Sequence, residues 1–395
     1  MNILRISNRL FPDSGGMAKQ AFILSKFCSQ KGINTFNLTC IPQNKSFIKK
    51  KSINKHFKII YLPTNAPGFN ASYIELILFT LKFLILGTIK ALQIVKKEKI
   101  NIIHAHSPPP SGFLAFIVNK ILKIPYLYTI HSLDIPTQLL LNIDIKFVAK
   151  NSKKIIAVSP GLKKYIQINY DINKVHWLPN GIILPKASLA LSLEEKELII
   201  KELKLNSFLD KDDFIIIYVG NMIFQQKVKG MIDFLAGFNN FIVKINPDGL
   251  KRGIKLLFIG EGSHSHLLEQ KIREFELENH VFLLGRRDDV DRILTISDLL
   301  ALTSYLEGFP NVILEAMSFK VPCIGTNVGG IKFLIGDTGY LVKPGDIEGI
   351  ENKICKFYEL SELERKELGK SAFDRIKKNF DLEIIGKKLL DLFYL

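Results

Sequence analysis

Cysteine is scarce in this chain of 395 residues, which contains four cysteines and one tryptophan. The cysteines, at positions 28, 40, 323 and 355, form no C-x-x-C pair and no spacing typical of metal ligands. This pattern excludes a disulfide-stapled scaffold and fits a reduced cytosolic protein. No secretory signal is apparent either, because the first apolar stretch is short and is interrupted by Arg5 and Arg9. We therefore expect a cytoplasmic location.

Acidic residues are rare in the first half of the chain. Residues 1–184 contain 25 Lys and Arg but only six Asp and Glu, a net charge of +19, whereas the remainder has a net charge of −3. A strongly basic domain indicates an anionic partner, either membrane lipid or nucleic acid. The chain has no RNA-recognition aromatic motif, zinc spacing or other nucleic-acid module, so we expect no nucleic acid.

The membrane hypothesis places the protein peripherally on the inner face of the cytoplasmic membrane. The alternative is that these basic residues only form a solvated surface in a chain that is rich in lysine. The lysines that cluster between two predicted strands are Lys45, Lys49, Lys50, Lys51, Lys55 and Lys58.

One apolar run, residues 74–95, has the length of a membrane span but carries Glu75, Lys82 and Lys90. A central lysine costs about 2.5–3.5 kcal/mol on insertion into a bilayer. Spacings of seven and eight residues place these side chains and Lys97 on one polar stripe, which predicts an amphipathic helix. This helix either packs into a core or is partly exposed and touches lipid.

Short apolar runs alternate with longer helical patterns, which is typical of parallel sheets built from βαβ units. We predict an α/β fold with two Rossmann-like, doubly wound domains joined near residues 183–190, and a ligand in the cleft between them at the carboxyl ends of the strands. The predicted strands are 3–7, 35–39, 58–62, 100–104, 126–129 and 155–158, followed by 214–219, 255–259, 281–284, 299–302 and 322–325.

The segment 307–315 is the most informative about function. Glu307 and Glu315 bracket a Gly-Phe-Pro turn, and an apolar helical pattern follows Pro310. Proline suits the first helical position, and the free N–H groups of a helix start bind anions. One carboxylate beside this start is suited to accept hydrogen bonds from a sugar and the other from a ribose. Taken alone, the pair would be two ordinary surface glutamates.

The surrounding sequence favours the functional interpretation. Residues 297–306 read SDLLALTSYL, residues 316–324 read AMSFKVPCI, and Gly329-Gly330 follow. Together these segments resemble the retaining glycosyltransferases of family 4, which have the GT-B fold. The resemblance runs, with gaps, from residue 1 to about residue 350. It implies an enzyme that transfers a hexose from a nucleotide-diphosphate sugar, UDP- or GDP-linked, to a glycan or lipid-linked acceptor in surface polysaccharide, lipopolysaccharide or glycoconjugate synthesis.

The resemblance also assigns roles to individual residues. Glu307 would contact the transferred sugar and Glu315 the ribose hydroxyls. His131, at the end of a predicted strand, would face the sugar without acting as a base. The remaining donor-binding positions would be Gly15, Gly16, Asn221, Lys229, Gly262, Arg286, Gly308, Phe309, Asn311 and Val312.

Three positions need comment. The family has an arginine where this chain has Asn221, so we expect weaker diphosphate binding unless Lys227 compensates. Phe333 replaces the family's usual glutamate. His104 and His106 leave one strand on the same side, but no Cys or carboxylate nearby completes a metal site. The family carries a similar pair that faces the acceptor.

The predicted organisation is an acceptor domain at 1–184, a nucleotide-sugar domain at 185–378 and a helix at 379–395 that crosses back to the first domain. No Asp-x-Asp motif stands out at a strand end, so we expect no metal and no cofactor. Two alternatives stay open. One is a pseudoenzyme that binds nucleotide-sugar without turnover, and the other is a nucleotide-sugar epimerase or phosphorylase.

Overall fold

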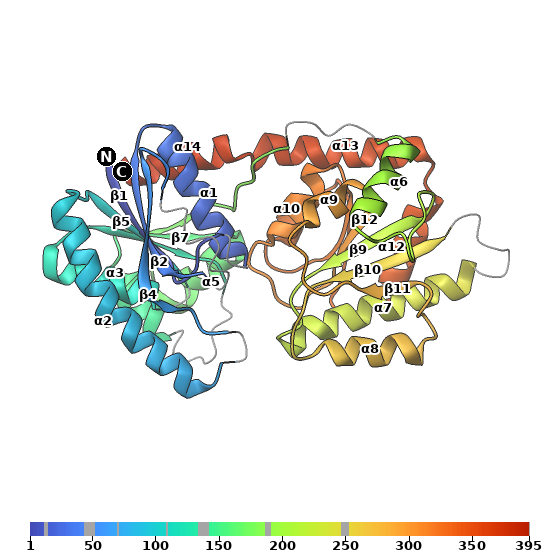
Figure 1. Ribbon diagram of the computed structural model, residues 1–395, viewed down its shortest axis with the longest axis horizontal. Helices are drawn as coiled ribbons and strands as arrows, with labels where there is room; N and C mark the ends of the chain where they lie inside the picture. The colour runs from blue at the N-terminus through green and yellow to red at the C-terminus, as the bar shows by residue number, and fades with distance from the viewer. Residues whose placement is uncertain are drawn as a thin grey trace. The chain divides into compact units, whose positions relative to one another are not determined.

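A computed structural model describes residues 1–11, 15–42, 52–68, 71–107, 110–132, 142–185, 191–245 and 253–394. The chain forms two compact units (Figure 1). The first contains Met1–Ile183 together with Phe380–Leu395, and the second contains Leu184–Asn379. Each unit has its own sheet, so the predicted pair of parallel α/β domains is confirmed.

The sheet of the first unit has eight strands in the order β3-β4-β2-β1-β5-β6-β7-β8. All neighbours are parallel except β3, which pairs antiparallel with β4 at the edge. The strands are β1 (Asn2–Ile6), β2 (Asn34–Ile41), β3 (Ser52–Asn54), β4 (Phe57–Asn65), β5 (Ile102–His106), β6 (Tyr126–Ile130), β7 (Lys154–Ala157) and β8 (Val175–Trp177).

Helices cover both faces of this sheet. On one face, α1 (Gly16–Gln30) and α14 (Leu382–Tyr394) pack against each other and share a core with Ile3, Ile102 and Leu127. The C-terminal helix therefore completes the core of the first unit (Figure 1). The other helices of this unit are α2 (Tyr73–Lys97), α3 (Ser111–Leu122), the π-helix η2 (Asp144–Ala149) and α5 (Pro160–Tyr170).

The second unit has a six-stranded sheet in the order β11-β10-β9-β12-β13-β14, and every neighbouring pair is parallel. Its strands are β9 (Phe214–Val219), β10 (Ile254–Ile259), β11 (Val281–Leu283), β12 (Leu299–Leu302), β13 (Cys323–Thr326) and β14 (Tyr340–Val342). Its helices are α6 (Leu193–Glu202), α7 (Gln225–Ile245), α8 (Ser265–Glu274), α9 (Val290–Thr295), α10 (Asn311–Ser318), α11 (Ile331–Ile335), α12 (Ile347–Glu359) and α13 (Glu362–Asn379).

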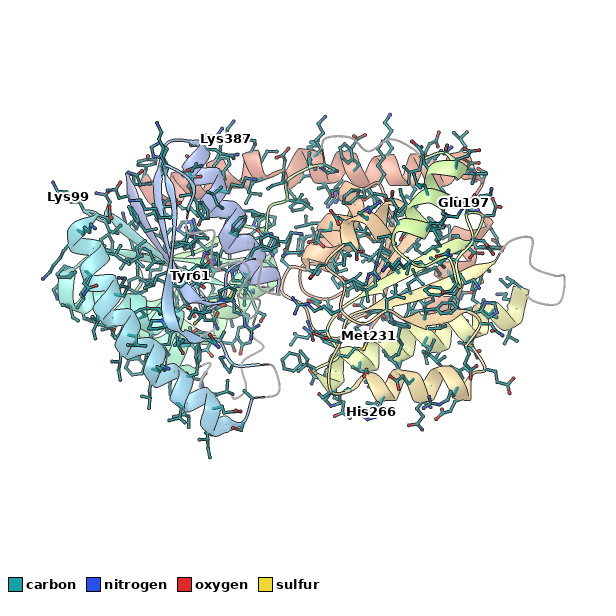
Figure 2. All side chains as sticks on the ribbon, viewed as in Figure 1. Tyr61, Lys99, Glu197, Met231, His266 and Lys387 are labelled. Atoms are coloured by element: carbon teal, nitrogen blue, oxygen red, sulfur yellow. The ribbon has the colours of Figure 1, made fainter. Side chains whose placement is uncertain are left out.

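The long apolar run forms α2, which begins with a capping box between Ser72 and Glu75. The polar stripe predicted for this helix is present, but it covers only part of the surface that the helix exposes to solvent. Phe79, Phe83 and Ala91 face the core, and a second set of apolar side chains is exposed to solvent. Within the parts of the chain that the structure describes, no helix is long and apolar enough to cross a membrane. Figure 2 labels Lys99 in the turn after this helix.

Candidate active site

The strand order of the second unit predicts where a ligand binds. The chain passes from β9 to β10 and β11 on one side of β9, and then returns to place β12 on the other side. At such a switch point the loops that follow the two central strands diverge to opposite faces and leave a crevice at the carboxyl edge. The loop after β9 leads into α7, and the loop after β12 carries Glu307.

Glu307 lies at this switch point. Its Oε1 accepts a hydrogen bond from Ser304 Oγ at 2.9 Å and lies 3.5 Å from Lys227 Nζ. The Glu307 side chain is 13% exposed and that of Lys227 is 25% exposed. The carboxylate is thus held by two partners from opposite sides of the switch point, yet it remains accessible to a small ligand.

Lys229 lies two residues further along α7. Its Nζ is 4.6 Å from the centre of the Tyr305 ring, and the Tyr305 hydroxyl donates to Asp233 Oδ2 at 2.7 Å. A cation over an aromatic face is attracted by the ring, so Tyr305 restrains the ammonium group. The close packing of α7 on the loop after β12 explains this contact, because a side chain at Gly230 would clash with the Thr303 carbonyl.

The first turn of α7, residues 225–228, contains Lys227 and no carboxylate. Positive charge near a helix N-terminus is unfavourable, since the helix dipole is also positive there. The Glu307 carboxylate, 3.5 Å from Lys227 Nζ, compensates this charge. Lys229 lies at the same end of the helix.

The loops after β9 and β10 lie backbone against backbone. Met222 N donates to Glu261 O, and His264 N donates to Met222 O, both at 3.0 Å. A side chain at Gly262 would overlap the Met222 backbone, which explains why glycine is needed there. Met231 of α7, labelled in Figure 2, is 1% exposed and lies next to Gly220 at the start of the first loop, where a side chain would come within 2.9 Å of the Met231 methyl group.

Asn221, in the same loop, is half-buried. Among the described residues its Oδ1 has no hydrogen-bond partner, although this atom is buried. Arg286 follows β11, is exposed, and lies 3.8 Å from Asp288. Both predicted positions are thus at the carboxyl edge of the sheet.

The Gly-Phe-Pro turn differs from its prediction by one residue. Pro310 is the cap residue with ψ of 121°, and α10 begins at Asn311. Extended backbone before the helix suits proline equally well, because its φ of −72° is ordinary for this residue. Phe309 is buried, and Asn311, Val312 and Glu315 are half-buried on α10.

A second turn supports this segment. Gly330 N donates to the Gly308 carbonyl at 2.8 Å. Gly329 has φ of +50°, and a side chain there would overlap the Glu307 carbonyl. The Gly-Gly pair therefore fixes the backbone of residues 307–308. Phe333 lies just beyond it on α11 and is 37% exposed.

His106 and His131 lie at the carboxyl ends of β5 and β6. His106 Nδ1 and His131 Nε2 are 3.0 Å apart, and His131 N donates to Ser107 Oγ at 2.9 Å. Burial lowers the pKa of His131 to about 4, so its ring is neutral at pH 7. A neutral ring binds a sugar hydroxyl but supplies no cation.

Gly15 is the cap residue of α1 and Gly16 is its first residue, and both are exposed. Pro12, Asp13 and Ser14, which precede them in the motif, lie outside the described residues. The same holds for Lys45, Lys49, Lys50 and Lys51 of the basic cluster.

Sequence reasoning missed Ser304, which donates to Glu307, and Arg5, which contacts two histidines. Lys227 was predicted to compensate for the charge missing at Asn221, but its contact with Glu307 was not predicted. Arg5 was interpreted only as a charge that interrupts an apolar run. Its position in a central strand is a signal that it is buried, since parallel strands are covered on both faces.

No group of three His, Cys, Asp or Glu side chains is placed to hold a metal ion in any of the described ranges. Metal independence stays a prediction.

Two parallel-sheet α/β units, the second with Glu307 and Lys227 in contact at its switch point, have the architecture of the GT-B type. Residues 15–184 match the family described as Glycosyltransferase Family 4, and residues 200–375 match Glycosyl transferases group 1. The chain belongs to the glycosyltransferases of family 4 and is a hexosyltransferase-type enzyme.

Individual proteins agree with this assignment. The N-acetyl-alpha-D-glucosaminyl L-malate synthase of Bacillus anthracis is 28% identical over an alignment of 316 residues, and the match covers 77% of each chain. The UDP-Gal:alpha-D-GlcNAc-diphosphoundecaprenol alpha-1,3-galactosyltransferase of Escherichia coli is 26% identical over 76% of this chain and 77% of its own. The structure of Anabaena HepE in complex with UDP and glucose has a TM-score of 0.77 at 19% identity, and the match covers 99% of both chains.

Proposed function

We propose that this enzyme transfers a sugar, with retention of anomeric configuration, from a nucleotide-diphosphate sugar to a glycan or lipid-linked acceptor. The observation that carries the proposal is the Lys227–Glu307 contact at the switch point, with Lys229 two residues further along α7. A carboxylate in contact with one lysine, with a second lysine at the same end of the helix, matches a ligand that has a hydroxylated sugar at one end and a diphosphate at the other.

The reaction must stabilise an oxocarbenium-like sugar and a departing diphosphate. In our assignment Lys229 and the N-terminus of α10 stabilise the negative charge that grows on the diphosphate. Glu307 accepts a hydrogen bond from the transferred sugar, Glu315 binds the ribose, and His131 donates to a sugar hydroxyl. No metal ion is required in this scheme, because the lysines and the helix N-terminus supply the positive charge.

The donor and acceptor classes are supported by the names of similar proteins. HepE was solved with UDP and glucose, and the Escherichia coli relative uses a diphosphoundecaprenol-linked acceptor. A capsular polysaccharide glycosyltransferase of Staphylococcus aureus is also 28% identical over 77% of this chain. We assign this chain to polysaccharide or glycoconjugate synthesis on that basis.

We further propose that the first unit docks on an anionic membrane surface. The exposed face of α2 carries large apolar side chains, and we name this set the apolar stripe of α2. Its members are Tyr73, Ile74, Ile77, Leu78, Leu81, Ile85 and Ile89, each 45–69% exposed. Lys82 and Lys90 are exposed on the same helix, and Glu75 is its only carboxylate. Apolar area beside lysines, in a half-chain with net charge +19, is suited to an interface between headgroups and acyl chains.

Vesicle sedimentation tests the membrane proposal. Leu81→Gln and Ile85→Gln should each weaken binding to anionic vesicles about tenfold, because each removes apolar area worth on the order of 1.5 kcal/mol. Ile168→Gln, at an isoleucine of α5 that is 68% exposed, is the matched control and should have no effect. Binding should also fall steeply with salt.

Two results would overturn it. One is equal binding to neutral and anionic vesicles, or none to either. The other is that the protein forms a dimer in the absence of lipid and that Leu81→Gln dissociates this dimer. The apolar stripe of α2 would then be an interface between two copies of the chain.

Sugar transfer itself is tested in two stages. A thermal-shift panel of nucleotide-sugars identifies the donor, since a ligand at 100 times its Kd adds about 2.7 kcal/mol of stability. The stabilising donor is then incubated with acceptors, and transfer is compared with donor hydrolysis. Binding without turnover would favour a pseudoenzyme. Phosphorolysis or epimerisation of the sugar would favour a phosphorylase or a nucleotide-sugar epimerase.

A further inference from the structure

A ladder of polar side chains crosses three strands of the first unit. Arg5 of β1 pairs in register with His104 of β5, and His106 pairs with Thr129 of β6. Side chains two residues apart on a strand share a face, so His131 continues the row beyond Thr129. On that face the strands begin with Ile3, Ile102 and Leu127, which belong to the core shared with α1 and α14. The polar ladder therefore occupies the carboxyl end of a face that is otherwise apolar.

The hydrogen bonds of the ladder form one continuous chain. Arg5 Nη1 lies 2.9 Å from His104 Nδ1 and 2.9 Å from His106 Nε2. His104 Nε2 lies 2.7 Å from Thr129 Oγ1, and His106 Nδ1 lies 3.0 Å from His131 Nε2. Arg5, His104 and His106 are each at most 1% exposed.

The direction of every bond follows from the arginine. A guanidinium group only donates hydrogen bonds, and each terminal nitrogen has two protons. Nη1 can therefore donate to both histidines, which makes His104 Nδ1 and His106 Nε2 acceptors. In a neutral imidazole the other nitrogen carries the proton. His106 is consequently protonated on Nδ1 and donates to His131 Nε2, which leaves the proton of His131 on Nδ1.

All three rings are neutral at pH 7. Burial lowers the pKa of His104 and His106 well below the ordinary value, and the charge of Arg5 lowers both further. Burial also lowers the pKa of Arg5, to about 10, so the guanidinium keeps its charge. The Arg5 guanidinium is thus always a hydrogen-bond donor at pH 7, and it fixes the tautomers of the histidines.

A buried arginine is costly, and this one has little compensation. Among the described residues its Nε and Nη2 have no hydrogen-bond partner, and Nη1 meets only imidazole nitrogens. Burial raises the pKa of the adjacent Cys28 thiol, which therefore offers no counter-charge. An apolar side chain of similar volume would avoid the desolvation cost. Stability of the core alone does not account for arginine at this position.

We propose that Arg5 is a positioning residue that fixes, through His106, the proton of His131 on Nδ1. His131 then presents an N–H donor, and its Nε2 is occupied by His106. No described residue pairs with His131 Nδ1, so this group is available to the hydroxyl oxygen of a sugar. The sugar contact rests on the function proposed above, whereas the tautomer does not.

Nuclear magnetic resonance reads the tautomers directly. The protein is labelled with ¹⁵N in its eight histidines, and long-range ¹H–¹⁵N correlations at pH 7 distinguish protonated from bare ring nitrogens. His131→Asn and His106→Asn assign the two signals. We expect protonated Nδ1 in His106 and His131 and protonated Nε2 in His104. A proton on Nε2 of His131 in the unaltered protein would overturn the proposal, whatever its activity.

Substitutions test the role of the arginine. Arg5→Lys retains a buried donor and should keep the tautomer of His131. Arg5→Met removes it, so His131 should become a mixture of tautomers. Arg9→Met is the matched control, because Arg9 is also buried but its guanidinium donates to the Pro67 carbonyl. Arg9→Met should leave the histidine spectrum unchanged. An unchanged His131 tautomer in Arg5→Met would contradict the proposal.

Kinetics connect the tautomer to function. In Arg5→Met, kcat should fall about tenfold, which corresponds to the loss of one hydrogen bond in the transition state. The KM for the donor should change little. Arg5→Lys should retain most of the wild-type kcat. If the predicted tautomers were found in an enzyme that transfers no sugar, the proposed function would be refuted, but the role of Arg5 in fixing the tautomers would stand.

Discussion

The ammonium group of Lys227 lies 3.5 Å from the carboxylate of Glu307, and the two residues come from opposite sides of the switch point between β9 and β12. This contact explains how a lysine can lie in the first turn of α7 despite the helix dipole. It also pairs Lys227 with a carboxylate. A diphosphate would compete with Glu307 for this lysine.

Glu307→Gln should lower kcat far more than it weakens binding of the free nucleotide diphosphate. The carboxylate is expected to meet the sugar, which the free nucleotide lacks. Loss of a charge-assisted hydrogen bond in the transition state would reduce kcat by roughly 10- to 100-fold. Steady-state kinetics and calorimetry measure the two quantities.

Glu315→Gln is the matched control on the neighbouring helix. It should show the reverse pattern, with weaker nucleotide binding, because Glu315 is assigned to the ribose. Equal losses in kcat and nucleotide affinity for Glu307→Gln would reassign Glu307 to nucleotide binding.

Lys229→Ala should weaken binding of nucleotide diphosphate much more than binding of nucleoside. Its ammonium is restrained by Tyr305 and has phosphate as its proposed partner. A charge-assisted contact is worth roughly 1.5–3 kcal/mol. Calorimetry with both ligands gives the difference, and Lys255→Ala, at another lysine over an aromatic ring, is the control. Unchanged diphosphate affinity would make Lys229 an ordinary surface lysine.

The sequence predicted the sheets well, because parallel strands are short apolar runs with helical patterns between them. All eleven predicted strands overlap observed ones, from β1 to β13. The three unpredicted strands, β3, β8 and β14, have three residues each. Segments this short give too few residues for a periodic pattern. β11 has the same length but was predicted, because it lies in the longer apolar run 281–284.

The site was only partly predictable for a related reason. Glu307, Lys229 and Gly262 stand in motifs that are local in sequence. The pairing of Lys227 with Glu307, and of Arg5 with His104, joins residues 80 and 99 positions apart, and only strand order brings them together. The sequence left two alternatives for α2, a core helix or a partly exposed one, because apolar residues on both sides of a helix look the same in sequence, whether they are buried or exposed.

Asn221→Arg should tighten diphosphate binding if this position corresponds to the arginine of the family. Asn221 follows β9, and its Oδ1 is buried without a partner among the described residues. An added charge near phosphate should strengthen binding by roughly 1–2 kcal/mol. Asn221→Gln adds length without charge and is the control. No gain in affinity would indicate that Lys227 already supplies this charge.

Asp144→Asn should remove a pH dependence of stability in the first unit. Tyr128 donates to Asp144 Oδ2 at 2.7 Å, and burial raises the pKa of this carboxyl from 3.8 to about 7. The folded state thus binds a proton more tightly than the unfolded chain. The stability from this group is fully present below about pH 4 and is lost as pH rises through 7.

Between pH 5 and pH 8 the wild-type protein should therefore lose roughly 2–3 kcal/mol of unfolding free energy at this group, and Asp144→Asn should not. Urea denaturation at the two pH values measures the difference. Asp288→Asn, at a carboxylate whose side chain is 93% exposed, should keep the wild-type dependence. If Asp144→Asn showed the same decline as the wild type, Asp144 would be ionised throughout this range. Its neighbours, rather than a proton, would then have to compensate a buried charge, and among the described residues its Oδ1 has no hydrogen-bond partner with which to do so.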